Sequence, residues 1–175
     1  QLAKIKKDSQ VKGILLEINS PGGAVYETAE ITRALKELQK TKKIPIYTSM
    51  ESQAASGGYY IAANSDRIYA TKDTMTGSIG VIMSSMNYSG LMEKLGISDT
   101  TIKSGALKDI GSSSRPQTKE DKEVLQGFVD SMYGRFVKNV AEGRNMDEEN
   151  VRKLADGRIY AGTQALENSL VDEIG

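Results

Sequence analysis

The residues with the clearest capacity for chemistry are one serine and the glycines around it. Ser56 lies in the run Ala54-Ala55-Ser56-Gly57-Gly58, and an earlier turn reads Ser20-Pro21-Gly22-Gly23. Each turn follows a strand-like segment and precedes a helix-like one, so both are expected at the carboxyl edge of a parallel sheet, where such folds bind ligands. Glycines leave backbone N–H groups accessible, and two such amides can stabilise a developing oxyanion. We predict Ser56 as a nucleophile, with the amides of Gly23 and Gly57 as its oxyanion hole.

Each turn also has a simpler interpretation. A serine directly before a helix is a common N-cap, and on the local sequence alone this is the better-supported role for Ser56. The Gly22-Gly23 pair is compatible with an ordinary turn before a helix. The two turns in combination favour a site more strongly than either turn does by itself.

A serine nucleophile needs a base, and the composition restricts the choice. The chain contains no His and no Cys, which excludes a Ser-His-Asp triad, thiol catalysis and zinc sites built on those ligands within it. A lysine held partly out of water can lose its proton near neutral pH and act as the base instead. Lys103 and Lys108 both flank a glycine- and serine-rich segment, and their spacing does not choose between them. A carboxylate at Asp109 would oppose this chemistry if it stayed close to the lysine that acts.

The order of the expected elements predicts an α/β fold. Strand, helix, strand in succession favours crossover units and a largely parallel sheet flanked by helices. The length of 175 residues favours a single catalytic domain over 1–175. We expect strands at 11–18, 44–50, 67–70 and 100–103, helices at 24–39, 54–63, 91–95, 118–141, 148–154 and 163–168, and a mobile loop at 105–117.

Four ordered motifs carry a resemblance that runs along nearly the whole chain. In them the chain resembles the signal peptide peptidase A (SppA) family of bacterial membrane-anchored serine proteases, in its half-length, Gram-positive-type form. The motifs are Asn19-Ser20-Pro21-Gly22-Gly23, the segment 54–62 that contains Ser56, Thr76-Gly77-Ser78-Ile79-Gly80-Val81 and Lys103-Ser104-Gly105-Ala106-Leu107-Lys108-Asp109.

The resemblance implies a role for particular residues. Ser56 matches the family's nucleophile, and Lys108 matches its general base, which settles the choice of lysine in a Ser-Lys dyad. Ser78 is similar to the serine that holds the base in place. Gly23 and Gly57 match the oxyanion hole.

The same resemblance implies a fold and a setting. The fold is that of the Clp protease and crotonase superfamily, built from repeated β-β-α units. The implied function is degradation of remnant signal peptides at the cytoplasmic membrane, after their release from secreted proteins. The implied assembly is a homo-oligomeric ring, octameric in the half-length form, with active sites built from neighbouring chains. A single-pass N-terminal anchor and the first strands are expected to be absent from this chain, and the catalytic domain is expected to be extracytoplasmic.

Other partners and activities have less support in the sequence. Lys+Arg and Asp+Glu both number 23, so the formal net charge is zero, which argues against nucleic acid as a partner. We expect no cofactor and no metal. A crotonase-like acyl-thioester enzyme could use the same two amides to hold an enolate, but such enzymes usually rely on a glutamate near the second turn, and 53–60 contains no acid. A catalytically silent membrane-associated scaffold is the alternative from another functional class.

Overall fold

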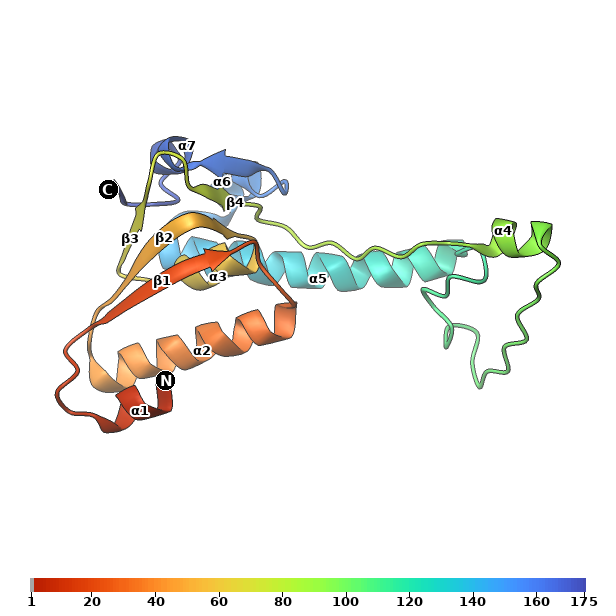
Figure 1. Cartoon of the computed structure of the whole chain (residues 1–175), viewed down its shortest axis with the longest axis horizontal. Coiled ribbons are helices and arrows are strands. Elements are labelled where there is room, and N and C mark those ends of the chain that lie inside the picture. The colour runs from red at the N-terminus through yellow and green to blue at the C-terminus, as the bar shows by residue number, and fades with distance from the viewer. Residues whose placement is uncertain (1) are drawn as a thin grey trace. The chain divides into compact units, whose positions relative to one another are not determined.

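The computed structural model describes residues 2–175 and divides them into two compact units. Unit 1 contains the described residues up to Gly80 together with Tyr133–Gly175, and unit 2 is Val81–Met132. Figure 1 labels the helices and strands of both units. The expectation of one catalytic domain over 1–175 stays a prediction.

Unit 1 is built from alternating strands and helices around one sheet. Helices and strands alternate over most of residues 2–80. The second part of unit 1, residues 133–175, begins within a long helix, α5, that starts in unit 2. The elements are α1 (Leu2–Lys7), β1 (Ile14–Ser20), α2 (Val25–Lys42), β2 (Ile46–Ala55), α3 (Gly57–Ala62), β3 (Arg67–Ala70), β4 (Met75–Gly77), α5 (Lys119–Arg144), α6 (Glu148–Leu154), β5 (Ile159–Ala161), α7 (Gly162–Glu167) and β6 (Glu173–Ile174).

The sheet is largely parallel, with β2 at its centre. Strand β2 pairs in parallel with β1, β3 and β4, and β3 pairs in parallel with β6. Only the β4–β5 pair is antiparallel among the described strands. The register between β1 and β2 shifts between Ile18 and Ser20, where β2 carries extra residues before its last pair, Ser20 with Ala54. The predicted α/β class with a largely parallel sheet is therefore confirmed.

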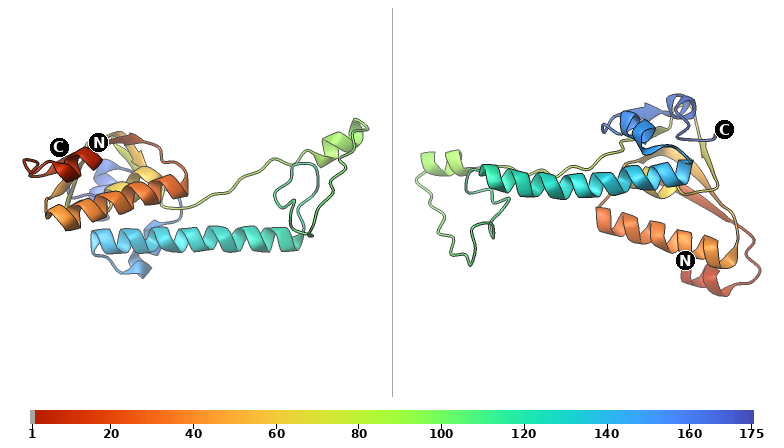
Figure 2. Two further views of the ribbon diagram at one scale, coloured as in Figure 1. Left: turned by 90° about the horizontal axis from the view of Figure 1, so that it is seen from below. Right: turned by 180° about the vertical axis from the view of Figure 1, so that it is seen from behind.

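The core of unit 1 lies between the sheet and the helices that cover one face of it. Ile18 of β1 and Met50 of β2 belong to the same buried apolar cluster as Tyr59 of α3 and Val140 of α5. Helix α3 and the second half of α5 lie on the same side of the sheet in each view (Figures 1 and 2). The opposite face is more open, since Leu15 is 65% exposed. Packing against the sheet and against α5 thus holds α3 in place, and with it Ser56, the residue that precedes α3.

Two glycines in the C-terminal part of unit 1 allow it to approach the backbone of the N-terminal part closely. A Cβ at Gly143 would lie 2.0 Å from the Ala63 carbonyl oxygen, and one at Gly162 would lie 1.9 Å from that of Thr71. Neither position can carry a side chain without a shift of the backbone. These contacts bring α5 onto the end of α3 and α7 onto the loop before β4.

Unit 2 contains α4 (Ser89–Lys94) and the first half of α5, joined by irregular segments and turns. Asp121, 1% exposed, is the one buried residue of 81–132. Its carboxylate accepts hydrogen bonds from Arg115, which also binds Asp109. Thr118 and Asp121 cap α5 reciprocally, each side chain bonding the other's backbone N–H at 2.9 and 3.0 Å. Charged hydrogen bonds take the place of an apolar core here.

Most expected elements are present, and one is wrong. The predicted strand at 100–103 is irregular, and it pairs with no strand among the described residues. Ile102 is 96% exposed, so a sequence with strand propensity has no neighbour that would stabilise a strand. The predicted helix at 54–63 begins only at Gly57, because Ala54 and Ala55 are the last residues of β2.

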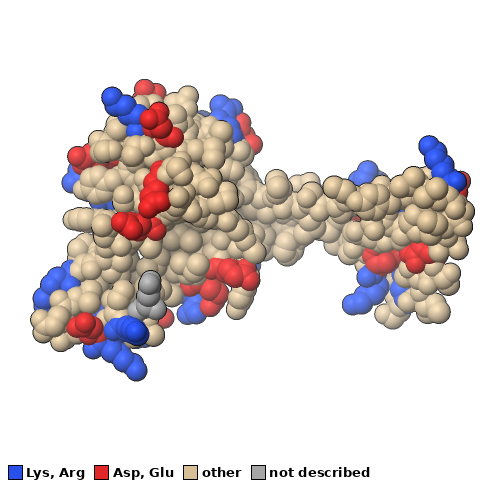
Figure 3. All heavy atoms as spheres, viewed as in Figure 1, with Lys and Arg blue, Asp and Glu red and all other residues tan. Residues whose placement is uncertain are grey.

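Two surface properties bear on possible partners. On the face of unit 1 drawn in Figure 3, basic and acidic side chains lie beside one another. Across residues 2–175, the helices are too short or too polar to cross a bilayer.

Candidate active site

Ser56 lies in the turn between β2 and α3. Its backbone has φ 51° and ψ −119°, a conformation that costs a non-glycine residue about 1–3 kcal/mol. Two hydrogen bonds hold it: the Ser56 N–H donates to the Gly77 carbonyl at 2.9 Å, and the Tyr60 N–H donates to the Ser56 carbonyl at 2.8 Å. A sharp, strained turn from strand to helix is the geometry that presents a nucleophilic hydroxyl at the edge of a sheet.

The hydroxyl of Ser56 does not cap α3. Ser56 occupies the N-cap position, but its side chain makes no capping hydrogen bond. The side chain is half-buried. The geometry therefore does not support the N-cap interpretation, and it leaves the hydroxyl free to react.

The two glycine turns touch each other. Gly22 has φ 119°, and a Cβ there would lie 2.8 Å from Ser56 Cβ and 2.9 Å from the Gly57 nitrogen. A Cβ at Gly57 would lie 3.1 Å from the Gly23 nitrogen. Because β1 and β2 are parallel, the turns that follow them meet at the carboxyl edge of the sheet, as expected.

The amides of Gly23 and Gly57 lie side by side and have no backbone acceptor within residues 2–175. Gly57 is the first residue of α3, and Gly23 directly precedes Ala24, the N-cap residue of α2. The N–H groups at the start of a helix lack intrahelical partners and favour negative charge nearby. The pair can therefore donate to an oxyanion formed beside Ser56.

Ser78 follows β4 at the same edge of the sheet. Ala55 of β2 pairs with Gly77 of β4, so Ser56 and Ser78 are the next residues after a paired position. Ser78 also has a positive φ, 48°. Its N–H donates to the Arg158 carbonyl at 2.8 Å, so the C-terminal half of unit 1 holds this turn in place.

Lys108 lies in unit 2, within the turns of 105–111. Its side chain is exposed, and its Nζ makes no ion pair with the carboxylates of the described residues. Lys103 differs, because its Nζ lies 2.8 Å from Asp109 Oδ1 and donates to the Ala106 carbonyl at 2.9 Å. Hydrogen bonds from Arg115, and then from Lys103, hold the pKa of Asp109 well below its usual range. The carboxylate that could have opposed a basic Lys108 is thus committed to two other cations.

The structure brings together four of the five predicted site residues, Ser56, Gly23, Gly57 and Ser78, all in unit 1. The fifth, Lys108, belongs to unit 2. Sequence reasoning missed the contact of Thr28 with Gly57 and the bond from Ser78 to Arg158. Nothing in the local sequence marks either contact, because each depends on how distant segments pack.

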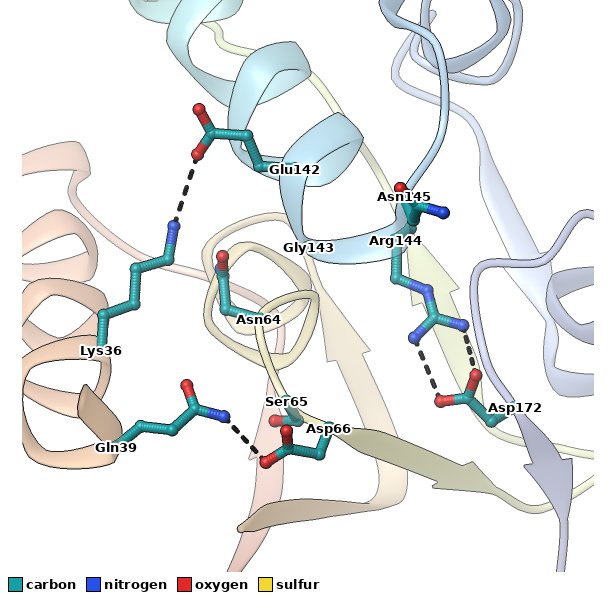
Figure 4. A pocket seen from close by; sticks show the side chains of 10 residues that line it. All are labelled: Lys36, Gln39, Asn64, Ser65, Asp66, Glu142, Gly143, Arg144, Asn145 and Asp172. Atoms are coloured by element: carbon teal, nitrogen blue, oxygen red, sulfur yellow. Dashed lines mark hydrogen bonds and ion pairs between the residues drawn. The ribbon is translucent and has the colours of Figure 1, made fainter. Parts of the chain in front are cut away.

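A polar pocket of about 440 Å³ in unit 1 lies at the other edge of the sheet (Figure 4). Asp66 directly precedes β3 and Asp172 directly precedes β6, so the pocket is at the amino ends of parallel strands. Arg144 donates to both oxygens of Asp172, at 2.7 and 3.0 Å, and Gln39 donates to Asp66 at 2.7 Å. Because these side chains already make hydrogen bonds to one another, we interpret the pocket as a structural network. The Ser56 turn is therefore the candidate site.

Comparison with known proteins identifies relatives along the whole chain. Residues 38–175 match the model of Peptidase family S49. A protein of Enterococcus faecium provisionally named signal peptide peptidase SppA is 61% identical over 177 residues, which cover 100% of this chain and 51% of that protein. A provisionally named protease of Methanocaldococcus jannaschii is 49% identical over 99% of this chain and 55% of its own length. Protease 4 of Haemophilus influenzae is 36% identical over 99% of this chain and 28% of its own length.

The chain spans about half the length of the first two of these relatives. The family match includes Ser56, Ser78 and Lys108, and the alignments with relatives also extend over the first glycine turn. By the extent of this match, the chain belongs to peptidase family S49.

Proposed function

We propose that this chain is the catalytic part of a serine endopeptidase in which Ser56 is the nucleophile and Lys108 is the general base. The observation that carries the proposal is the Ser56 turn: a strained residue whose hydroxyl caps no helix and whose neighbours offer two unpaired amides. The family and the names of the relatives, which are peptidases and proteases, support hydrolysis of peptide bonds.

In the first half of the reaction, Lys108, which is exposed in the single chain and is withdrawn from water in the proposed ring, accepts the Ser56 proton while Oγ attacks the carbonyl carbon of the peptide. The oxygen of the tetrahedral adduct becomes negative and accepts hydrogen bonds from the amides of Gly23 and Gly57. When the adduct collapses, the C–N bond breaks and the departing amine takes the proton from the Lys108 ammonium. An acyl ester remains on Ser56.

In the second half, water attacks this ester. Lys108 accepts a proton from the water, and the same two amides stabilise the second oxyanion. Collapse breaks the ester bond, releases the carboxyl product and returns the proton to Ser56 Oγ. Ser78, at the same edge as Ser56, accepts a hydrogen bond from Lys108 Nζ and so orients the base.

The substrates we propose are remnant signal peptides, with small or apolar residues near the cut. The name of the Enterococcus faecium relative supports this class of substrate. The proposed setting is the outer side of the cytoplasmic membrane, with a single-pass anchor in the full protein. The proposed assembly is an octameric ring whose sites draw on neighbouring chains, and the proposed fold is of the Clp protease and crotonase type, without a cofactor.

Paired arginine substitutions test the choice of base. Arginine keeps the charge and the length of lysine but does not give up its proton in proteins. Lys108→Arg is expected to lower kcat by ~10²–10⁴, the usual contribution of a general base. Lys103→Arg is expected to retain most activity, because arginine can still pair with Asp109. Turnover of a fluorogenic peptide measures both, and Ser56→Ala sets the background.

Labelling with a fluorophosphonate probe tests the nucleophile directly. The probe is expected to attach to Ser56 in the wild-type chain and to be absent from Ser56→Ala, as peptide mapping would show. A folded wild-type chain that stays unlabelled would favour the silent scaffold instead. An active Lys108→Arg variant would mean that the base is another group.

A further inference from the structure

Thr28 lies in the first turn of α2, and both its backbone and its side chain are bonded to the start of that helix. The Thr28 N–H donates to the Ala24 carbonyl at 3.2 Å, and its Oγ1 donates to the same oxygen at 2.9 Å. The residue is only 8% exposed. Its hydroxyl is therefore fixed in place, one residue away from Gly23 through Ala24.

The same side chain lies against the second glycine turn. A Cβ at Gly57 would lie 2.7 Å from Thr28 Oγ1, 3.1 Å from the Gly23 nitrogen and 3.4 Å from Thr28 Cγ2. These three atoms are the nearest neighbours of that position. Gly57 thus lies against one continuous segment, which contacts it through Gly23 just before α2 and through Thr28 in the first turn of α2.

We propose that Thr28 is the positioning residue of the oxyanion hole, which sets the distance between the amides of Gly23 and Gly57. The inference rests on the function proposed above. One side chain is bonded to the residue after Gly23 and rests against Gly57 through its Oγ1, so loss of the hydroxyl bond or a bulkier group in place of Oγ1 moves one amide relative to the other. Because Thr28 touches neither substrate nor reacting atoms in this scheme, its effect passes through the backbone.

The hydroxyl matters more than the methyl group in this contact. Oγ1 is the atom nearest to the Gly57 Cβ position, and an oxygen allows a closer approach than a methyl group would. A threonine that bonds back to the carbonyl four residues earlier slightly destabilises a helix, so a tertiary contact accounts for its presence here. Thr32 makes the same kind of bond one turn later, to the Thr28 carbonyl at 2.9 Å, and is 4% exposed.

Three substitutions separate positioning from stability. Thr28→Val keeps the shape of the side chain but replaces Oγ1 with a methyl group, whereas Thr28→Ser keeps the hydroxyl. Thr32→Val removes a matched bond at similar burial, one turn further from the site. We expect kcat to fall about tenfold in Thr28→Val, a part of the ~10²–10³ that one whole oxyanion donor contributes. KM should stay unchanged, and Thr28→Ser and Thr32→Val should keep near wild-type kcat.

A second readout reports on the oxyanion hole itself. A peptide boronate forms a tetrahedral adduct with a nucleophilic serine, and its affinity should fall in Thr28→Val in step with kcat/KM. The affinity of an uncleaved peptide, measured in a Ser56→Ala background, should not change. Thermal unfolding should show similar stability for Thr28→Val and Thr32→Val.

Two results would overturn the inference while leaving the proposed function intact. One is wild-type kcat in Thr28→Val. The other is a loss that Thr28→Ser does not rescue or that weakens uncleaved peptide equally, since either pattern would make Thr28 a structural residue. Absence of turnover and of Ser56 labelling in the wild-type chain would instead remove the proposed function, and this inference with it.

Discussion

At the scale of single residues, Ser56 is held in a conformation that most side chains avoid. Bonds to Gly77 and from Tyr60 hold it from two different elements, and Gly22 fits against its Cβ only because it has no side chain. A strained backbone conformation that several neighbouring elements hold in place is characteristic of functional positions. The conformation of Ser56 is thus a product of packing as much as of residue type.

The two proposed oxyanion donors should respond differently to alanine. At Gly57 a Cβ would lie 2.7 Å from Thr28 Oγ1 and 3.1 Å from the Gly23 nitrogen, whereas at Gly23 nothing described lies within 4 Å. Gly57→Ala should therefore displace its amide and lower kcat by ~10²–10³, while Gly23→Ala keeps most activity. Peptide turnover, with circular dichroism as a check on folding, measures both. Equal losses in the two variants would contradict the geometry.

The position of Ser56 and the two glycines at one edge of the sheet could be predicted from the sequence, because two small-residue turns, each between a strand and a helix, are expected at the carboxyl edge of a parallel sheet. Their roles in catalysis stay predictions. The sequence could not exclude the N-cap role, since a capping serine and a nucleophilic serine occupy the same position in a local pattern. Thr28 was not predictable: its importance comes from a contact between α2 and α3 that no local pattern encodes.

At the scale of elements, the approach of α5 to the end of α3 depends on one glycine. A Cβ at Gly143 would lie 2.0 Å from the Ala63 carbonyl oxygen. Gly143→Ala should lower the free energy of unfolding by at least ~2 kcal/mol, because a backbone has to move to make room. Urea unfolding followed by circular dichroism measures the change.

Gly134 in the same helix is the matched control. Nothing described lies within 4 Å of a Cβ there, so Gly134→Ala should raise stability by ~0.5–1 kcal/mol through helix propensity alone. If Gly143→Ala also stabilised the protein, the close packing of α5 on α3 would be wrong.

The long elements could be predicted from periodicity, and the short strands could not. Helix α2 and the long helix α5 have stripes of apolar residues over several turns, and both were expected within a few residues of their bounds. Strands β4, β5 and β6 have three, three and two residues, too few for any alternation to show. They form because a neighbouring strand offers an edge to pair with: β2 pairs with β4, β3 with β6, and β4 in turn with β5.

At the scale of the whole molecule, the two units are stabilised by different forces. Unit 1 buries an apolar cluster, whereas the one buried residue of unit 2 is Asp121. Hydrogen bonds from Arg115, and then from the Thr118 N–H, lower the pKa of Asp121 to about 2. Unit 2, which carries the proposed base, therefore depends on ionisation for its order.

This dependence predicts the acid response of unit 2. An unfolded aspartate titrates near pH ~3.9. Since the folded pKa of Asp121 is lower, its stabilisation is complete above the unfolded value and is lost as pH falls through the folded one. The gap in urea midpoint between the wild type and Asp121→Asn should be constant above pH ~5 and shrink between pH ~4 and ~2.

Glu123→Gln is a suitable control, because the Lys119–Glu123 pair is 93% and 64% exposed, and exposed pairs contribute little. Its midpoint should stay close to that of the wild type at each pH. A gap for Asp121→Asn that is the same at pH ~6 and pH ~2 would rule out the ionised carboxylate as the source of the stability.

The bond from the Ser78 N–H to the Arg158 carbonyl, together with the pairing of β5 on β4 and of β6 on β3, has a consequence for biosynthesis. Chains fold from their N-terminus as the ribosome extends them. A nascent polypeptide exposes Ser56 well before the segment that secures the neighbouring turn has been translated. The sheet that carries the Ser56 turn can be completed only after β6, Glu173–Ile174, has been translated as well, so residues 1–80 alone cannot hold the neighbouring Ser78 turn in its final place.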